Sequence, residues 1–209
     1  MPDVGSVSLG RPYLVRPDDG SLSMNSKEFV LAAVHAQPSE LRHASPELLA
    51  DRDFLIEVVR QRPTALDFVP AAFREDKQFI MQAVAAVASA LEFAPPAFRA
   101  DPEVVLAATS AAPGALVFAD DSLRSDRAFV LEAIARSSGE VLQHAAECLR
   151  EDKDFVVSAA RTSPSALAFA SERLRRDNEV VLSAVRKDGN ALRHASREMR
   201  ESNKVVLIA

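Results

Sequence analysis

The chain has 209 residues, 48% of them hydrophobic and 26% charged, which is the composition of a folded protein and not of a disordered one. Its 25 basic and 30 acidic side chains give a net charge of −5, and this disfavours a general nucleic-acid binder, because such proteins neutralise phosphates with a basic surface. The single cysteine, Cys148, excludes an internal disulfide and a cysteine-cluster metal site, so we expect an intracellular reducing compartment or an organelle interior.

Residues 1–23 are rich in proline, glycine and serine, which predicts an extended N-terminal arm. They lack the basic flank and the apolar run of a signal peptide, and no later stretch is long and apolar enough to predict a membrane span. Tyr13 and Leu14, in the sequence PYLVRP, are candidate partner contacts of this arm. We expect the arm either to cap the first repeat or to act as a strap on a partner.

A short sequence pattern recurs eight times from residue 26 to the end of the chain. The copies are SKEFVLAAV at 26, DRDFLIEVV at 51, DKQFIMQAV at 76, DPEVVLAAT at 101, DRAFVLEAI at 126, DKDFVVSAA at 152, DNEVVLSAV at 177 and SNKVVLIA at 202. A second pattern, of the type ALxFA, keeps the same rhythm, with its leucine at 41, 66, 91, 116, 142, 167 and 192. Every step is 25 residues except one of 26, which lies around Ser137–Gly139. A fixed period of this kind indicates a repeat architecture.

Each repeat predicts two helices of two to three turns. An aspartate, or a serine in the first and last copies, precedes the first apolar residue by three, which is the N-cap position of the first helix. That helix ends after about ten residues at a column of helix-breaking residues. The column holds Pro38, Pro63, Pro113, Gly139, Pro164 and Gly189, with Ala88 as the exception. The second helix carries the ALxFA pattern, and a last single turn leads into the next cap.

Helices this short are marginal alone and bury each other's apolar faces when they stack. We therefore predict an all-α fold, an α-solenoid of about seven 25-residue two-helix repeats plus a partial eighth, over residues 24–209. The sequence ends in VVLIA, inside the first helix of the eighth copy. This ending indicates either a fragment or an end that docks on another molecule.

Three of the four histidines share one column with phenylalanine. His43, His144 and His194 stand where other repeats have Phe68, Phe93, Phe118 and Phe169. We therefore expect these histidines to fill a half-buried aromatic position, and they are too far apart in the array to converge on one metal ion. The sequence offers no triad, no phosphate-binding glycine loop and no metal-ligand spacing. Hence we predict no catalytic residue, no cofactor and no metal site, and no enzyme activity.

Arginine recurs two residues before the aspartate cap. The members of this column are Arg74, Arg99, Arg124, Arg150, Arg175 and Arg200. The aspartate caps keep the same step, so we expect each arginine to lie near a carboxylate of its own or the adjacent repeat. This interpretation is preferred to a ladder that binds a polyanion.

The middle of the array is unusually apolar. Between Ala83 and Ala119 only four residues are charged, and positions that are charged in other repeats hold alanine or valine. An apolar patch on an otherwise charged solenoid indicates a contact site, although alanine is also a good helix former. The candidate partner-interface residues are Ala86, Val87, Ala112 and Val117.

The pattern ALxFASExLRxDxEVVLxAV, clearest at Ala166–Val185, resembles the tandem repeat family called domain of unknown function 4116. The resemblance covers about residues 24–209, and it departs from the family where this chain has phenylalanine or histidine in place of a typical tyrosine. The family implies a helical repeat fold and brings no catalytic residue or cofactor. A looser similarity to the variant leucine-rich repeats concerns the fold alone.

The function we expect is a non-catalytic protein-interaction scaffold, an accessory or structural subunit of a larger multiprotein and possibly organellar complex. Its partners would be other proteins, with no nucleic acid. One alternative is a nucleic-acid-binding helical repeat protein. It requires a basic face, whereas the variable position of ALxFA is mixed in sign, with Arg42, Asp67 and Glu92 among its members. The other alternative is the repeat region of a longer enzyme or effector.

Overall fold

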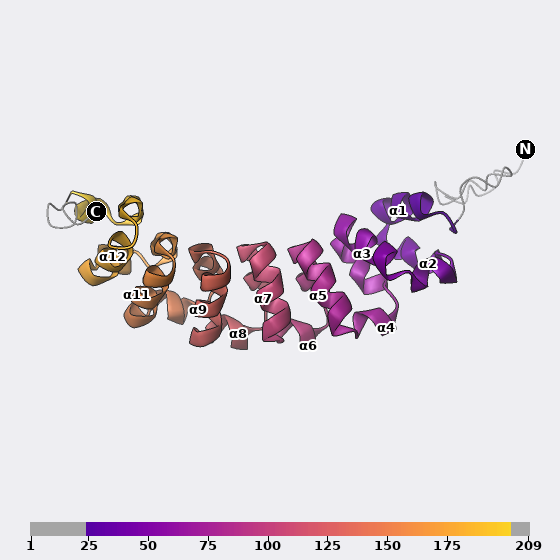
Figure 1. Cartoon of the computed structure of the whole chain (residues 1–209), viewed down its shortest axis with the longest axis horizontal. Helices are drawn as coiled ribbons and strands as arrows, with labels where there is room; N and C mark the ends of the chain where they lie inside the picture. Colours follow the sequence, from indigo (N-terminus) through magenta and orange to yellow (C-terminus); the bar gives the residue numbers. More distant parts are fainter. Residues whose placement is uncertain (1–23, 202–209) are drawn as a thin grey trace, which may run out of the picture.

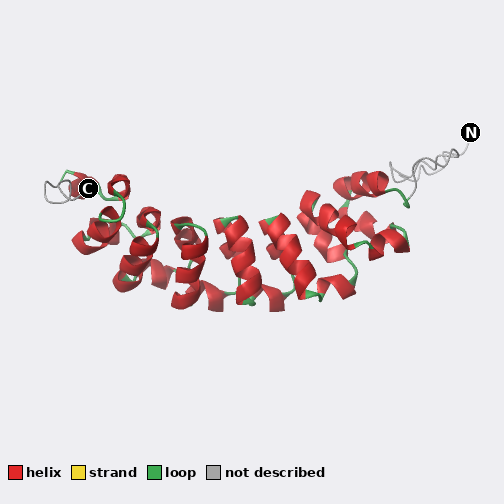
Figure 2. Cartoon of the chain, viewed as in Figure 1, coloured by secondary structure: helices red, strands yellow, loops and turns green. Residues whose placement is uncertain are grey.

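The computed structural model describes residues 24–201, and every regular element in that range is a helix. Figure 1 shows one gently curved arc, in which the repeats follow one another from the N-terminal to the C-terminal end. Figure 2 shows that only short loops join the helices of the described range. The all-α repeat array predicted from the sequence is therefore confirmed. None of these helices is long and apolar enough to cross a membrane.

Each repeat contains a long α-helix, a 3₁₀-helix and a short final helix. The long helices are α1 (Lys27–Ala36), α3 (Arg52–Gln61), α5 (Lys77–Ala86), α7 (Pro102–Ala111), α9 (Arg127–Arg136), α11 (Lys153–Thr162) and α12 (Asn178–Val185). The 3₁₀-helices are η1 (Pro38–His43), η2 (Pro63–Phe68), η3 (Ala88–Phe93), η4 (Pro113–Phe118), η5 (Gly139–His144), η6 (Pro164–Phe169) and η8 (Gly189–His194). The short helices are α2 (Pro46–Ala50), α4 (Ala71–Arg74), α6 (Pro96–Arg99), α8 (Asp121–Ser125), α10 (Glu147–Glu151), η7 (Leu174–Arg176) and α13 (Arg197–Arg200).

The predicted N-caps begin the long helices. Asp51 accepts a hydrogen bond from the Phe54 backbone N–H at 3.0 Å, and Asp152 accepts one from the Phe155 N–H at 2.8 Å. The same contact recurs at Ser26, Asp101, Asp126 and Asp177, and Asp76 accepts instead from the N–H of Gln78, two residues on. Each cap satisfies a backbone donor that the first helical turn leaves free.

The second helix of each repeat is a 3₁₀-helix, a type of helix that the sequence pattern did not specify. With three residues per turn, residues three apart share an edge of the helix. In η2, Ala65 and Phe68 therefore share one edge, Leu66 and the following Val69 share a second, and Asp67 occupies the third. Ala65, Leu66 and Val69 are buried, Phe68 is half-buried and Asp67 is exposed. The pattern ALxFA is thus that of a 3₁₀-helix with two edges turned inward.

The 26-residue repeat has its extra residue where the sequence placed it. α9 ends at Arg136, and both Ser137 and Ser138 precede η5, whereas one residue separates these elements in the repeats before it. Here η5 lies directly against η6. The Gly139 N–H donates to the Ser163 Oγ at 3.0 Å, and a Cβ at Gly139 would lie 2.1 Å from the Ala166 backbone N. Glycine is required at this position because a backbone segment occupies the space of a side chain.

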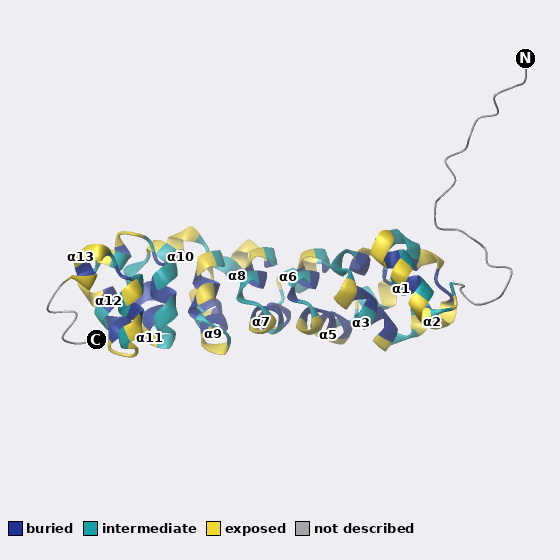
Figure 3. Cartoon of the chain, turned by 90° about the horizontal axis from the view of Figure 1, so that it is seen from above, coloured by how far each residue is buried: buried dark blue, intermediate teal, exposed yellow. Residues whose placement is uncertain are grey.

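The array has two layers with the core between them. In Figure 3, α5, α7, α9 and α11 lie along one side, and α6, α8 and α10 lie along the other. Figure 1 places α4, α6 and α8 on the outer, convex edge of the arc. Small side chains allow the long helices to approach closely, as at Ala83, Ala108 and Ala133, which are fully buried. Leucines of the 3₁₀-helices, such as Leu66 and Leu116, close the core from the other layer.

Ion pairs connect the first turns of neighbouring long helices. The pairs are Lys27–Asp51, Arg52–Asp76, Lys77–Asp101, Arg127–Asp152 and Lys153–Asp177. The arginine column does not supply these cations, although Arg99 and Arg124 do lie near a carboxylate, that of Asp120. The cation is the residue that follows the cap of the preceding repeat, because helices packed side by side bring equivalent first turns together.

The arginine column instead joins repeats through its backbone. The carbonyls of Arg99 and Arg124 accept hydrogen bonds of 2.9 Å from the N–H groups of Asp120 and Ala146 in the next repeat. Within the described part of the chain, Arg124 is the one member of this column that forms an ion pair, with Asp121.

Candidate functional site

The predicted interface residues lie at two different places on the repeats. Ala86 is the exposed last residue of α5, whereas Val87 and Ala112 are half-buried and pack against the core. Val117 is 48% exposed and lies near the C-terminal end of η4, whereas Ala112 precedes the N-terminal end of that helix. At roughly 2 Å per residue, the two positions are about 10 Å apart along the helix axis. The structure therefore divides the four residues between two surfaces. Tyr13 and Leu14 lie outside the described residues.

Exposed small residues cover the C-terminal ends of α5 and α7. This surface, here called the alanine edge, consists of Ala85, Ala86, Ser110 and Ala111, all exposed. In other repeats most of the equivalent positions carry a charged or polar side chain, whereas Ala36 of α1 and Ala135 of α9 are exposed alanines as well. Among the charged and polar residues are Arg60 and Gln61 in α3, Arg136 in α9, Arg161 in α11, and Arg186 and Lys187 after Val185 of α12. The residues that replace charged side chains in α5 and α7 thus lie on the surface of the protein and not in its core.

A row of aliphatic side chains runs along the outer side of the long helices beside the alanine edge. Its members, here called the aliphatic row, are Leu31, Ile56, Met81, Leu106, Leu131, Val157 and Leu182. Five of them are half-buried, and Leu106 and Val157 are each 7% exposed. Sequence reasoning counted this column as core, because its composition does not distinguish a buried column from a partly open one.

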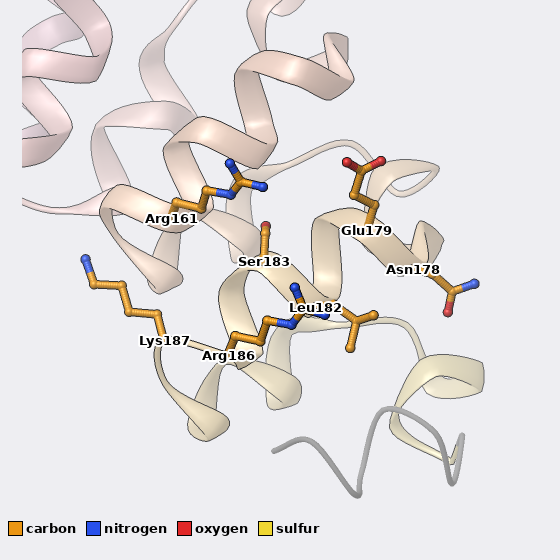
Figure 4. Close-up of a pocket in the computed structure, with 7 residues that line it drawn as sticks. All are labelled: Arg161, Asn178, Glu179, Leu182, Ser183, Arg186 and Lys187. Carbon is orange, nitrogen blue, oxygen red and sulfur yellow. The ribbon is translucent and has the colours of Figure 1, made fainter.

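The side of the long helices that carries the aliphatic row has a hollow of about 530 Å³ at α11 and α12. It is lined by Arg161, Asn178, Glu179, Leu182, Ser183, Arg186 and Lys187. Figure 4 shows the guanidinium groups of Arg161 and Arg186 on the two sides of Ser183. Leu182, a member of the aliphatic row, supplies an apolar part of the lining. Arg161 and Arg186 occupy equivalent positions of successive repeats, so each of the two repeats contributes one arginine to the hollow.

Several polar groups of the hollow are already engaged within the protein. Glu179 pairs with Lys153 at 3.0 Å, and the Ser183 hydroxyl donates to the Val180 carbonyl at 2.6 Å. The Lys187 ammonium donates to the Thr162 carbonyl at the end of α11. The guanidinium groups of Arg161 and Arg186, by contrast, form no hydrogen bond or ion pair with any residue of the range 24–201. The charged groups of the hollow that have no partner among these residues are therefore both cations.

Sequence reasoning missed this hollow, although a signal existed. The two columns at the end of the long helix change from alanine in α5 and α7 to basic residues at 161, 186 and 187. That change was used only to identify the apolar middle, and the basic residues were not considered as a site of their own.

The histidine column is only in part as expected. His144 and His194 are half-buried and have η4 and η6 packed before their own 3₁₀-helices, whereas His43 is exposed, because within the described residues no 3₁₀-helix precedes η1. Burial, followed by the nearby charges of Arg193 and Arg175, lowers the pKa of His194. Cys148 is an exposed free thiol. Within residues 24–201, no group of three or more His, Cys, Asp or Glu side chains is arranged to hold a metal ion.

Comparison with known proteins agrees with the repeat architecture. The sequence pattern of the family described as Domain of unknown function (DUF4116) matches residues 26–74, 76–124, 101–150, 126–175 and 152–200. Each match spans two of the 25-residue repeats, and several matches overlap by one repeat, so the single repeat is the structural unit. No curated protein and no solved structure is significantly similar to the chain. The family matches cover most of the chain, which therefore belongs to the DUF4116 family.

Proposed function

We propose that the protein is a non-catalytic interaction scaffold, an accessory subunit of a multiprotein assembly, and that a protein partner covers the alanine edge. The observation that carries this proposal is the exposure of Ala85, Ala86 and Ala111 at positions that hold Arg60 and Gln61 in the preceding repeat and Arg136 in the following one. Charged residues are depleted from the centres of protein interfaces, because their desolvation opposes binding. Removing apolar surface from water contributes about 25 cal/mol per Å².

Two further features support a protein partner. The aliphatic row lies beside the alanine edge and extends the apolar surface along the array. Val117, on η4, is the one large hydrophobic side chain of residues 24–201 that belongs to the exposed class. It offers a second apolar contact on the other layer.

The test is cross-linking mass spectrometry on the native assembly, with the wild-type chain compared with the double variant Ala86→Lys/Ala111→Lys. Both positions are exposed, so the lysines have room in the folded protein. We expect the cross-links to the partner to disappear, because two ammonium groups would have to be desolvated in the interface. The matched control is Ala72→Lys/Ala97→Lys, which makes the same change at exposed positions of α4 and α6 in the other layer. An unchanged set of partners in the Ala86→Lys/Ala111→Lys variant would contradict the proposal.

A further inference from the structure

We propose that the hollow between α11 and α12 binds an acidic segment of a partner polypeptide. This inference rests on the proposed scaffold function and adds the chemistry of the ligand. The alanine edge on α5 and α7 and the arginines of the hollow on α11 and α12 occupy the same columns of the repeat, with α9 between them, so one elongated partner can contact both. The apolar part of that partner would lie on α5 and α7, and its carboxylates would lie at the hollow.

The first argument is the hydrogen bonding of the hollow. Glu179, Ser183 and Lys187 are each satisfied by a partner inside the protein. Arg161 and Arg186 are exposed and have no such partner within the described residues. A guanidinium group presents five donors in a planar fork that matches a carboxylate. The ligand that completes this site is therefore an anion.

The second argument concerns the size and lining of the hollow. Its volume of about 530 Å³ exceeds what a single small anion fills. Leu182 is half-buried and belongs to the aliphatic row, so part of the lining favours hydrocarbon. A carboxylate carried on methylene groups, next to an aliphatic side chain, satisfies both parts. This composition is that of a peptide and not of free phosphate.

The third argument favours a peptide over a nucleic acid. Asp154 and Glu179 are exposed in the first turns of α11 and α12, on the far side of the aliphatic row from the arginines. A phosphate backbone laid across these helices would meet this acidic border, and the chain as a whole carries a net charge of −5. A peptide places negative charge only where its sequence has it, so it can set carboxylates at the arginines and neutral residues beside Glu179, which also lines the hollow.

The spacing of the two arginines fits an extended peptide. Neighbouring packed helices lie about 8–10 Å apart, and in a polyproline II chain, with three residues per turn and about 3.1 Å rise per residue, residues three apart share one face about 9 Å apart. Carboxylates three residues apart can therefore each meet one of the two guanidinium groups. One of the two intervening side chains would lie toward Leu182.

The experiment measures fluorescence anisotropy of labelled peptides with the full chain. The probe is a Leu-Glu-Glu repeat of about twelve residues, long enough to cross several helices, and its neutral counterpart is the Leu-Gln-Gln repeat. We expect the acidic peptide to bind at least about tenfold more tightly than the neutral one, and Arg161→Ala/Arg186→Ala to remove at least about tenfold of its affinity. Arg176→Ala/Arg197→Ala, which removes the same charge from exposed positions outside the hollow, should leave the affinity unchanged.

Three results would overturn the inference. The first is equal affinity of wild type and Arg161→Ala/Arg186→Ala for the acidic peptide, with both chains folded by circular dichroism. The second is equal binding of the acidic and neutral peptides. The third is preferential binding of single-stranded oligo(U) RNA, which would assign the arginines to a nucleic acid.

The alanine-edge variant separates this inference from the proposed function. Ala86→Lys/Ala111→Lys should keep its affinity for the acidic peptide, because neither position lines the hollow. If that variant loses the native partner while the acidic peptide binds equally well without the arginines, the scaffold function stands and the peptide site fails. If the peptide site responds as expected while the variant keeps every partner, the assignment of the alanine edge fails instead.

Discussion

The contact between α5 and α7 and the contact between α7 and α9 differ at the residue that follows the N-cap of the first helix. In the first, Lys77 follows the cap of α5 and pairs with Asp101 at 2.8 Å and with Glu103 at 2.7 Å. In the second, the residue that follows the cap of α7 is Pro102, which has no charge to offer to Asp126. Asp126 still caps α9, through the Ala128 and Phe129 N–H groups, but it belongs to no ion pair of the described residues.

This difference shows that one sequence position serves two purposes. Proline is favoured at the first helical position because its missing N–H would be free in any case. A basic residue at the same position connects its helix to the next one. α7 therefore begins with a residue that favours helix initiation, and it has no ion pair to α9. The α7–α9 contact can thus serve as the reference for measuring what the ion pair adds to the α5–α7 contact.

The largest expected effect on stability comes from the core beside the α5–α7 contact, the contact that has the ion pair. Phe79 in α5 is fully buried, and its ring lies 5.3 Å from that of Phe73. Phe79→Ala should cost about 3–5 kcal/mol, because it leaves a cavity that the surrounding repeats fill only in part. Val104→Ala, at the equivalent and equally buried position of α7, removes less hydrocarbon and should cost about 2 kcal/mol. Hydrogen exchange resolved along the chain measures both, and equal losses at the two sites would contradict this ranking.

The helix caps give the next largest effect. Asp101→Ala and Asp126→Ala each remove an N-cap, which costs about 1 kcal/mol. Asp101→Ala also removes the carboxylate that Lys77 contacts, so we expect it to destabilise more than Asp126→Ala does. Urea unfolding followed by circular dichroism measures the difference. A larger loss for Asp126→Ala would mean that the ion pair adds nothing to the α5–α7 contact.

The repeat architecture could be predicted from the sequence because its signals are local. Helix ends are set by the caps, by the column of Pro and Gly, and by the extra residue near Ser137, and each of these affects only the backbone a few residues away. The partners of the charged residues could not be predicted in the same way. Two columns, the arginines before the caps and the cations after them, share one period, and spacing alone does not decide which one reaches Asp76 or Asp101.

The candidate site was predictable only in part, for a similar reason. The column with Ala86 and Ala111 differs from its counterparts in composition, so its exposed apolar surface was expected. Val87 and Ala112 belong to the same apolar stretch but pack against the core, and nothing in their sequence context distinguishes them from Ala86. The hollow depends on which polar groups are engaged, such as Lys187 on the Thr162 carbonyl, and only the three-dimensional structure shows this.

Acid should weaken the contacts that contain ion pairs. The hydrogen bond from Lys27 lowers the pKa of Asp51, and the hydrogen bond from Arg52 lowers the pKa of Asp76. A carboxyl whose pKa is lower in the folded state than in the unfolded state stabilises the fold above its unfolded value, and this stabilisation is lost as the pH falls through the folded value. Stability should therefore decline below about pH 4, where unfolded aspartates begin to bind protons.

The variant Asp51→Asn/Asp76→Asn tests this dependence, because asparagine keeps the capping oxygen and does not titrate. Its stability should fall less steeply with acid than that of the wild type in urea unfolding between pH 6 and pH 3, a range that brackets the usual aspartate value. Asp67→Asn, at an exposed position of η2, is the matched control. Parallel pH profiles for the wild type and the double variant would show that these two carboxylates do not govern acid stability.

The smallest effect is also the most direct test of the comparison. Pro102→Lys should supply the missing cation next to Asp126, as Lys77 does next to Asp101. An exposed pair of this kind contributes about 0.2–1 kcal/mol, and the loss of proline at the first helical position offsets part of it. Pro102→Ala measures that offset alone, so the difference between the two variants is the contribution of the charge. This difference should shrink in about 1 M salt, where the Debye length falls to about 3 Å, and it should vanish when Asp126→Asn is added. A gain that persists in both conditions would come from helix propensity, and the lack of a cation at position 102 would then have no energetic consequence for the α7–α9 contact.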